Sequence, residues 1–268
     1  MLDIHSHSLH SHDANYDVTE MCEAACKQGI TVFAVTDHYD MCGDQALLAE
    51  FDLQIMQSAA DTRTAAELYQ DRLRLLVGIE LGQPLENRAK SESVIGSYPF
   101  DFILGALHNA PGRPDLYDFV SDEADEDLNV YLEAYFTALL DTIRWGRFDS
   151  AAHITYPFRY ILRRQKKPYP FRRWDDYIEA AVMLLAEKSL ALELNTSGLR
   201  REPSYIMPDA RWIKRFRELG GEKLTIGADA HTPNNVGSGI AEGMDIAAKA
   251  GFRYLCYFVS RGPQYFKL

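Results

Sequence analysis

The stretch LDIHSHSLHSHDA, residues 2–14, contains four of the eight histidines of this 268-residue chain. Its first residues form an apolar run that predicts a β-strand reaching His5. Because side chains alternate between the two faces of a strand, His5 and His7 point to one side and Ile4 to the other. Two imidazoles on one side can bind one cation, so the stretch predicts the start of a metal site.

The same arrangement recurs along the chain: a short apolar run is followed by a metal-binding or polar side chain. Candidate strands cover residues 2–5, 30–36, 75–79, 102–107, 150–153, 190–194, 224–227 and 254–258. In parallel α/β folds the carboxyl ends of the strands meet at one edge, where ligands bind. We therefore expect a single site to collect the side chains at these strand ends, which are Asp37, His38, Glu80, His108, His153, Asn195, Asp229 and His231.

Stretches with helical spacing lie between the strands and indicate the fold class. A helix is expected over residues 18–28, capped by Thr19 and ended by Gly29. Others are expected over 174–188 and 208–219, with Pro208 in the first turn of the latter. Alternating strands and helices predict an α/β fold with a parallel sheet, either closed as a barrel or open and doubly wound. Because α/β barrels reach this length as one unit, we expect a single domain over residues 1–268.

Composition and charge exclude several classes of protein. The formal net charge of -11 argues against a broad basic surface for nucleic acid. No apolar run approaches the roughly 20 residues of a membrane span, and the first residues lack the basic and apolar regions of a secretory signal. We therefore expect a soluble, cytoplasmic protein with reduced thiols at Cys22, Cys26, Cys42 and Cys256.

Two charged blocks stand out from this background. The acidic run 115–127 precedes the apolar spacing of residues 128–139 and is expected to be a solvated helix entry, since carboxylates stabilise a helix N-terminus. The basic block RYILRRQKKPYPFRR, residues 159–173, contains two prolines and predicts a loop. That loop is either solvated or collects anions over the site.

The candidate ligands indicate a class of chemistry. Mixed imidazole and carboxylate sets suit zinc, manganese or iron, and the candidates outnumber the three or four ligands that one ion takes. Ions about 3.5–4 Å apart are typical of phosphate ester hydrolysis, where they supply hydroxide and stabilise the leaving alkoxide. The chain has no P-loop, no G-x-G-x-x-G after a strand and no G-x-S-x-G elbow. Metal-dependent phosphoester hydrolysis is therefore favoured over nucleotide-dependent and serine hydrolase chemistry.

Seven motifs carry a resemblance to a known family. In chain order they are DIHSHS, AVTDH, GIE, GALHN, AAHI, LELNTSGLR and GADAHTP, and they cover essentially the whole chain. The set resembles the PHP (polymerase and histidinol phosphatase) metallohydrolases, and within them the histidinol-phosphate phosphatases. This resemblance implies a distorted (β/α)7 barrel with a trinuclear metal centre at the carboxyl edge of its strands.

The resemblance also implies which residues bind the three ions. One ion takes His5, His7, Glu80 and Asp229, and Glu80 bridges to a second ion that also takes His108 and His153. The third ion takes Asp13, His38 and His231, with His12 as the alternative to Asp13. His10 and His12 otherwise support ligands, face the substrate or belong to the loop.

Two arginines are implied as the clamp for the substrate phosphate. Arg159 follows the fifth-strand histidine, and Arg200 ends the segment NTSGLR. The planar fork of arginine binds phosphate through two parallel hydrogen bonds. After the fifth strand this chain reads AHITYPFRY, whereas relatives often carry a GHxDL-like turn. The departure concerns the substrate pocket more than the metal centre.

The implied function is hydrolysis of L-histidinol phosphate to L-histidinol and phosphate by a cytoplasmic, metal-dependent phosphomonoesterase of histidine synthesis. Glu80 and Asp229 are the catalytic candidates, with Asp229 or a water protonating the leaving alkoxide. The alternatives are another small phosphoester or nucleotide, a nucleic-acid 3′ end, and a non-catalytic metal-stabilised or metal-sensing protein. The net charge counts against nucleic acid, so the expected partner is a small phosphomonoester.

Overall fold

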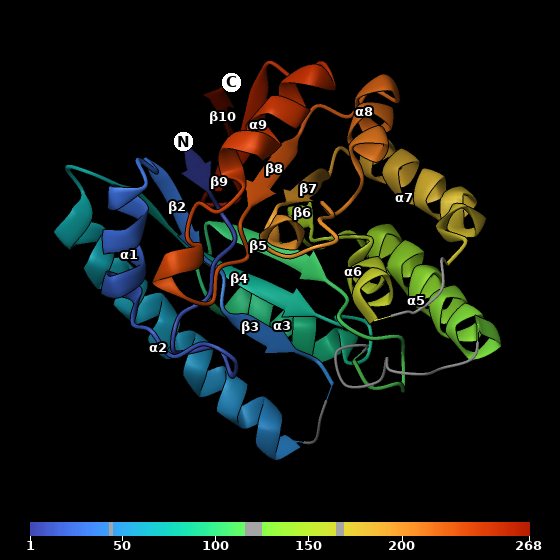
Figure 1. Ribbon diagram of the computed structural model, residues 1–268. Helices are drawn as coiled ribbons and strands as arrows, with labels where there is room; N and C mark the ends of the chain where they lie inside the picture. The colour runs from blue at the N-terminus through green and yellow to red at the C-terminus, as the bar shows by residue number, and fades with distance from the viewer. Residues whose placement is uncertain (43–44, 116–124, 165–168) are drawn as a thin grey trace.

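A parallel sheet forms the centre of the molecule. The computed structural model describes residues 1–42, 45–115, 125–164 and 169–268 (Figure 1). Strands lie side by side in the order β1 (Leu2–Asp3), β2 (Val32–Val35), β4 (Arg74–Gly82), β5 (Phe102–Ala106), β6 (Ser150–Ala151), β7 (Ala191–Asn195) and β8 (Leu224–Gly227). A short strand, β3 (His38–Asp40), also pairs with β4, placing His38 opposite Glu80. Near-continuous apolar runs such as VFAV suit strands that are buried on both faces.

The sheet closes on itself between its first and last strands. Beyond β1, the backbone N–H of Ile4 donates to Ile226, 3.1 Å, and that of His7 donates to Ala230, 2.9 Å. The buried carboxylate of Asp3 accepts from the backbone of Ala228 and Gly237, at 2.8 and 2.9 Å. These contacts join the two edges, so the predicted distorted (β/α)7 barrel is confirmed and the open sheet is excluded.

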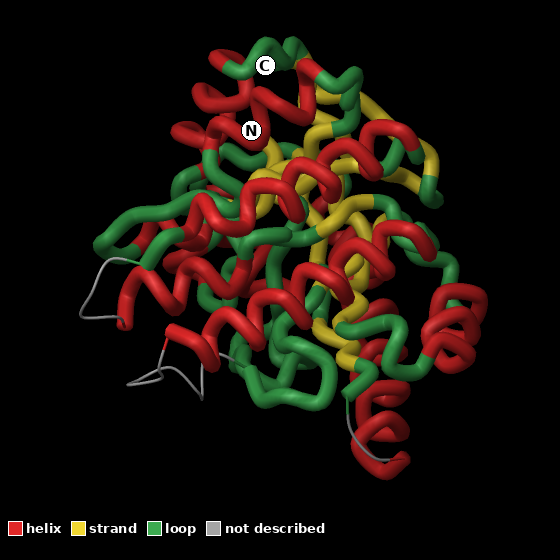
Figure 2. Tube along the Cα trace, turned by 90° about the vertical axis from the view of Figure 1, so that its right-hand side faces the viewer, coloured by secondary structure: helices red, strands yellow, loops and turns green. Residues whose placement is uncertain are grey.

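Helices form an outer layer around the strands, as Figures 1 and 2 show. Their buried apolar residues belong to one core with those of the strands, which is the usual arrangement in α/β folds. They are α1 (Val18–Lys27), α2 (Gln45–Tyr69), α3 (Arg88–Ser97), α5 (Asp125–Trp145), α6 (Tyr156–Arg164), α7 (Asp175–Glu187), α8 (Ala210–Glu218) and α9 (Ile240–Lys249). Short 3₁₀ turns are η1 (Phe171–Trp174), η2 (Ser197–Arg200) and η3 (Pro233–Asn235).

Helix α1 begins at residue 18 as predicted, but its predicted cap and the predicted start of α8 are each wrong by two residues. The cap of α1 is Asp17 rather than Thr19, because its carboxylate accepts from the backbone of Glu20, 2.8 Å, while the Glu20 carboxylate accepts from the backbone of Asp17, 3.0 Å. Helix α8 begins after Asp209, whose side chain accepts from the backbone of Arg211 at 3.0 Å. Pro208 therefore precedes the cap instead of lying in the first turn.

The charged blocks are only partly described. The loop predicted for the basic block is wrong over residues 159–164, which belong to α6. The two prolines on which that prediction rested, Pro168 and Pro170, do not prevent this helix, because both follow its last residue, Arg164. Residues 165–168 of the block, and 116–124 of the acidic run, lie outside the described residues. The end of the acidic run enters α5 as expected.

A hairpin covers the amino-terminal end of the barrel, opposite the expected site. It pairs β9 (Tyr254–Val259) with β10 (Gly262–Lys267), and only β9 was predicted. Its turn is anchored where the backbone of Ser260 donates to Asp101, 2.8 Å, and Arg261 Nε donates to Asp149, 2.5 Å. Both aspartates precede strands of the barrel.

Among the described helices, none has the length and apolar character needed to cross a membrane.

Candidate metal centre

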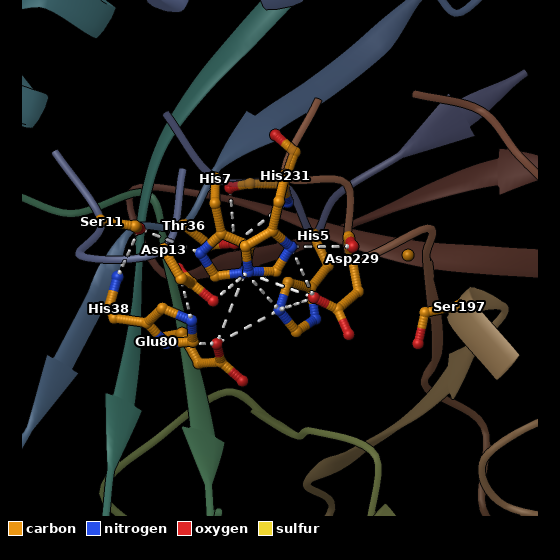
Figure 3. A network of polar contacts seen from close by, with 12 residues as sticks. His5, His7, Ser11, Asp13, Thr36, His38, Glu80, Ser197, Asp229 and His231 are labelled. Carbon is orange, nitrogen blue, oxygen red and sulfur yellow. Dashed lines mark hydrogen bonds and ion pairs between the residues drawn. The ribbon is translucent and has the colours of Figure 1, made fainter. Parts of the chain in front are cut away.

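The side chains expected at the strand ends do converge at the carboxyl edge of the barrel (Figure 3). All of the strand-end side chains expected from the sequence except Asp37 and Asn195 line a cavity of about 770 Å³. One wall includes Glu80, Asp229 and imidazoles from the ends of different strands, and the other wall includes arginines of α6 and η2. Parallel strands bring these distant segments together because all of them end at this edge.

The first predicted ligand set surrounds one point. His5 Nε2 lies 3.1 Å from His7 Nε2 and 3.3 Å from Glu80 Oε2. His7 Nε2 lies 3.5 Å from Asp229 Oδ1. The backbone alternation predicted for this stretch therefore brings both imidazoles toward the same pair of carboxylates.

Glu80 occupies the centre of the second set. Its Oε1 lies 2.8 Å from His153 Nε2 and 3.2 Å from His108 Nε2. Its Oε2 faces His5 and, at 3.0 Å, His38 Nδ1. The two oxygens of one buried carboxylate thus face different groups of imidazoles, which is the geometry that a bridging ligand needs.

Asp13 lies between the imidazoles of the third set. Its Oδ2 is 2.9 Å from His231 Nε2, and its Oδ1 is 3.6 Å from His38 Nε2. The ring of His12 lies 5.2 Å from that of His38, and His12 also lines the cavity. His10 instead turns toward α2, where its Nε2 lies 2.8 Å from Asp61 Oδ2.

The chemistry of these groups fits divalent ions. Glu80 Oε2 and His38 Nδ1 lie 3.0 Å apart without hydrogen-bond geometry, and among the described residues neither of these buried atoms has another hydrogen-bond partner. Burial would raise the pKa of Glu80, but His5, His108 and His38 hold the pKa of this carboxyl well below its usual value. Groups of such side chains lie close enough to share an ion, among them His5 with His7 and Asp229, and His5 with Glu80 and His153. Buried unpaired polar atoms are costly, and a bound cation removes that cost.

The imidazoles differ in protonation within this cluster. Burial would lower the pKa of His5, but Glu193, Glu80 and Asp229 raise its pKa well above the usual value. Burial and repulsion from His231 and His38 lower the pKa of His7 to about 3. His7 is therefore a neutral imidazole at physiological pH, which is the form that binds metal ions.

The sequence reasoning missed two carboxylates that orient these imidazoles. Glu193 Oε1 lies 2.6 Å from His5 Nδ1, and its Oε2 accepts from the backbone N–H of His153 at 2.8 Å. Asp40 Oδ1 lies 3.0 Å from His108 Nδ1. Metal-bound histidines usually donate their second N–H to such a group. The sequence did contain a signal for both carboxylates, because residues two apart in a strand lie on the same face. Glu193 has this spacing to Asn195, and Asp40 has it to His38.

The two predicted phosphate-binding arginines line the cavity in different ways. Arg159 Nη1 donates to Ser197 Oγ, 2.7 Å, and lies 3.7 Å from Asp229 Oδ2, and Nη2 donates to the hydroxyl of Tyr160, 2.7 Å. The Nε of Arg159 is buried and has no hydrogen-bond partner among the described residues. Arg200 donates to the backbone carbonyls of Ala228 and Asp229, the latter at 3.0 Å. Asn195 supports this wall, because its side-chain oxygen accepts from the hydroxyl of Ser197 at 2.7 Å.

Comparison with known sequences settles the family. The PHP domain matches residues 3–197. The chain belongs to the PHP domain family. The match covers strands β1 to β7, and β8 then supplies Asp229 and His231 to the same edge.

Relatives of this PHP chain align over nearly its full length. Proteins named probable histidinol-phosphatase are 27% identical in Clostridium acetobutylicum, covering 94% of this chain and 95% of the relative, and 29% identical in Thermotoga maritima, covering 95% and 94%. A crystal structure of histidinol phosphate phosphatase from Lactococcus lactis, complexed with zinc, L-histidinol and phosphate, has the same fold. Its TM-score is 0.82 at 24% identity, covering 98% of each chain.

Proposed function

We propose that this PHP chain is a metal-dependent phosphomonoesterase that hydrolyses L-histidinol phosphate to L-histidinol and phosphate. The observation that carries the proposal is Glu80, whose two oxygens face different imidazole groups in a cavity that also contains the guanidinium of Arg159. Histidinol-phosphatase relatives of matching length support the substrate. We propose residues 1–268 as a single domain, since the barrel and the hairpin pack together.

The metal centre is proposed to hold three divalent ions in the three side-chain sets described above. The ligands are His5, His7, Glu80 and Asp229 for the first, Glu80, His108 and His153 for the second, and Asp13, His38 and His231 for the third. Zinc in the Lactococcus structure supports zinc, while manganese and iron suit the same ligand types. When bound, such ions supply hydroxide at neutral pH and neutralise charge on a phosphoryl group.

The chain's own residues orient the phosphate and limit the choice of proton donor. Arg159 presents its fork beside Asp229, where it can bind phosphoryl oxygens, and Arg200 holds the loop that follows β8. Burial would raise the pKa of Asp229, but His5, His7, His231 and Arg159 hold the pKa of this carboxyl well below its usual value. An ionised Asp229 is suited to bind metal, so the proton for the leaving alkoxide is assigned to water.

A turnover assay tests the substrate. The purified protein, stripped with a chelator and reloaded with zinc or manganese, is expected to hydrolyse L-histidinol phosphate with a kcat/KM far above that for p-nitrophenyl phosphate or a nucleoside monophosphate. The stripped protein is expected to be inactive. Equal kcat/KM for all of these esters would refute the histidinol phosphate proposal and favour a different small phosphoester.

A further inference from the structure

A buried aspartate beside the centre is fully occupied by hydrogen bonds. Asp37 lies between β2 and β3 and has 0% exposure. Its Oδ1 accepts from the backbone of Ser8, 2.6 Å, and from Ser11 Oγ, 2.7 Å. Its Oδ2 accepts from Ser8 Oγ, 2.7 Å, and from Ser58 Oγ of α2, 2.5 Å. A carboxylate has about four acceptor positions, so Asp37 has none left for a metal ion.

Ser11 connects this aspartate to two candidate ligands. Its hydroxyl has one hydrogen, which it donates to Asp37. Toward His7 Nδ1, 3.1 Å away, and toward the backbone N–H of His38, 3.1 Å away, the Ser11 oxygen can therefore only accept. Figure 3 shows Ser11 beside His38 at the edge of the imidazole cluster.

The direction of these hydrogen bonds decides where the proton of His7 lies. A neutral imidazole has one N–H and one acceptor nitrogen. Because Ser11 accepts, Nδ1 of His7 carries the hydrogen, and Nε2 keeps its lone pair. That nitrogen lies 3.5 Å from Asp229 Oδ1 and 3.6 Å from Glu80 Oε2, inside the first ligand set.

We propose that Asp37 is a positioning residue for the metal centre. Through Ser11 it fixes the tautomer and ring orientation of His7 and holds the backbone of His38, and through Ser58 it ties both to α2. The inference rests on the proposed metal centre. It does not depend on the identity of the substrate, because it concerns how the protein prepares its ligands before any substrate binds.

Three variants separate this role from a merely structural one. Ser11→Ala removes the acceptor for His7, and Asp37→Ala removes the acceptor of the Ser11 hydroxyl, which is then free to turn its hydrogen toward His7. Ser91→Ala is the matched control, because Ser91 is equally buried and its hydroxyl donates to the carbonyl of Pro84, 2.7 Å, with no contact to the imidazoles. All three lose one or more buried hydrogen bonds, each worth about 0.5–1.5 kcal/mol, so all three are expected to melt at lower temperature.

Zinc affinity and the His7 tautomer are the two readouts. Zinc affinity is measured by competition with a chelator, and the His7 tautomer by NMR of the metal-free protein labelled with ¹⁵N-histidine. Ser11→Ala and Asp37→Ala are expected to bind zinc about 10–100-fold more weakly and to lose the fixed Nδ1–H form of His7. Ser91→Ala is expected to keep both.

The outcomes also distinguish this proposal from the proposed function. Wild-type zinc affinity and an unchanged His7 tautomer in Ser11→Ala and Asp37→Ala would overturn the role of Asp37. A wild-type protein that binds zinc but does not hydrolyse histidinol phosphate would refute the substrate, while weakened zinc binding in the two variants would still support Asp37. A wild-type protein that binds no zinc would overturn both.

Discussion

Among single residues, Glu80 is the one whose position most strictly requires its own side chain. Each of its oxygens faces a different imidazole group, so only a carboxylate of this length supplies two anionic atoms at these points. Glu80→Gln replaces one oxygen by an amide nitrogen that cannot bind a cation. We expect turnover to fall by more than the about 10–100-fold typical of residues that only support ligands, and the ion content to fall as well.

Elemental analysis and steady-state kinetics check this expectation. Glu92→Gln provides the control, because Glu92 lies on α3 and pairs with Arg88 at the surface. Unchanged turnover and ion content in Glu80→Gln, with circular dichroism showing an intact fold, would contradict a bridging role.

Arg159 differs from Arg200 in what remains available to a substrate. Each Nη group of Arg159 donates one hydrogen bond within the protein, to Ser197 and to Tyr160, and among the described residues its Nε has no partner. Arg200 instead donates to two backbone carbonyls. Arg159→Lys keeps the charge but loses the fork, and charged hydrogen bonds are worth about 1.5–3 kcal/mol. We expect kcat/KM for the phosphate ester to fall about tenfold or more. Arg72→Lys is the control, because Arg72 pairs with Glu23 at the surface. An equal kcat/KM in the two variants would show that Arg159 does not bind the phosphate.

At the scale of strands and helices, the end of β8 leaves space for His5, which follows β1. A Cβ on Gly227 would lie 2.2 Å from His5 Cβ and 2.9 Å from Glu193 Oε1. Gly227→Ala therefore has to displace His5, and overpacking of this kind costs about 1–3 kcal/mol. We expect a lower melting temperature and weaker zinc binding.

A second glycine gives the matched control for that substitution. A Cβ on Gly96, in α3, meets no atom within 4 Å, so Gly96→Ala is expected to stabilise the helix by about 0.5–1 kcal/mol. Calorimetry and zinc titration of the two variants provide the comparison. If Gly227→Ala binds zinc as well as the wild type, the close packing of His5 against β8 has no bearing on the metal centre.

The elements also show what could be predicted from sequence. Strand ends were readable because apolar runs stop at polar residues, and this placed the candidate ligands of the centre at one edge. Helix α2 was missed because its buried face includes Ser58 and Thr62, while Leu53 and Leu68 are exposed, so the contrast between its faces is weak. Glu193 was missed because its role depends on its contact with His5, which is far away in the sequence. A single acid inside an apolar strand does not indicate that contact.

At the scale of the whole molecule, the metal-free barrel holds a dense cluster of opposite charges. Burial would lower the pKa values of His5, His38 and His108, but nearby carboxylates, Glu80 among them, raise these pKa values well above their usual level. The stability these imidazoles contribute is fully present below about pH 6.5 and is lost as pH rises through their folded values. The pKa values of Glu80 and Asp229 are depressed, so their contribution is present above about pH 4 and is lost in acid.

The metal-free protein is therefore expected to be most stable between about pH 4.5 and 6.5, and to melt at progressively lower temperature from pH 6.5 to 9. With zinc, the melting temperature should instead rise with pH above pH 6.5. A bound zinc ion neutralises the carboxylates at every pH, and it binds more tightly as the imidazoles lose their protons. Melting curves from pH 5 to 9, with chelator and with zinc, measure how the melting temperature depends on pH in both forms.

Glu80→Gln should make the melting temperature of the metal-free protein depend less on pH, since it removes the carboxylate that His5, His38 and His108 share. A metal-free melting temperature that stays constant or rises above pH 6.5 would mean that the imidazoles are neutral before metal binds, and that the charge cluster does not stabilise the empty barrel.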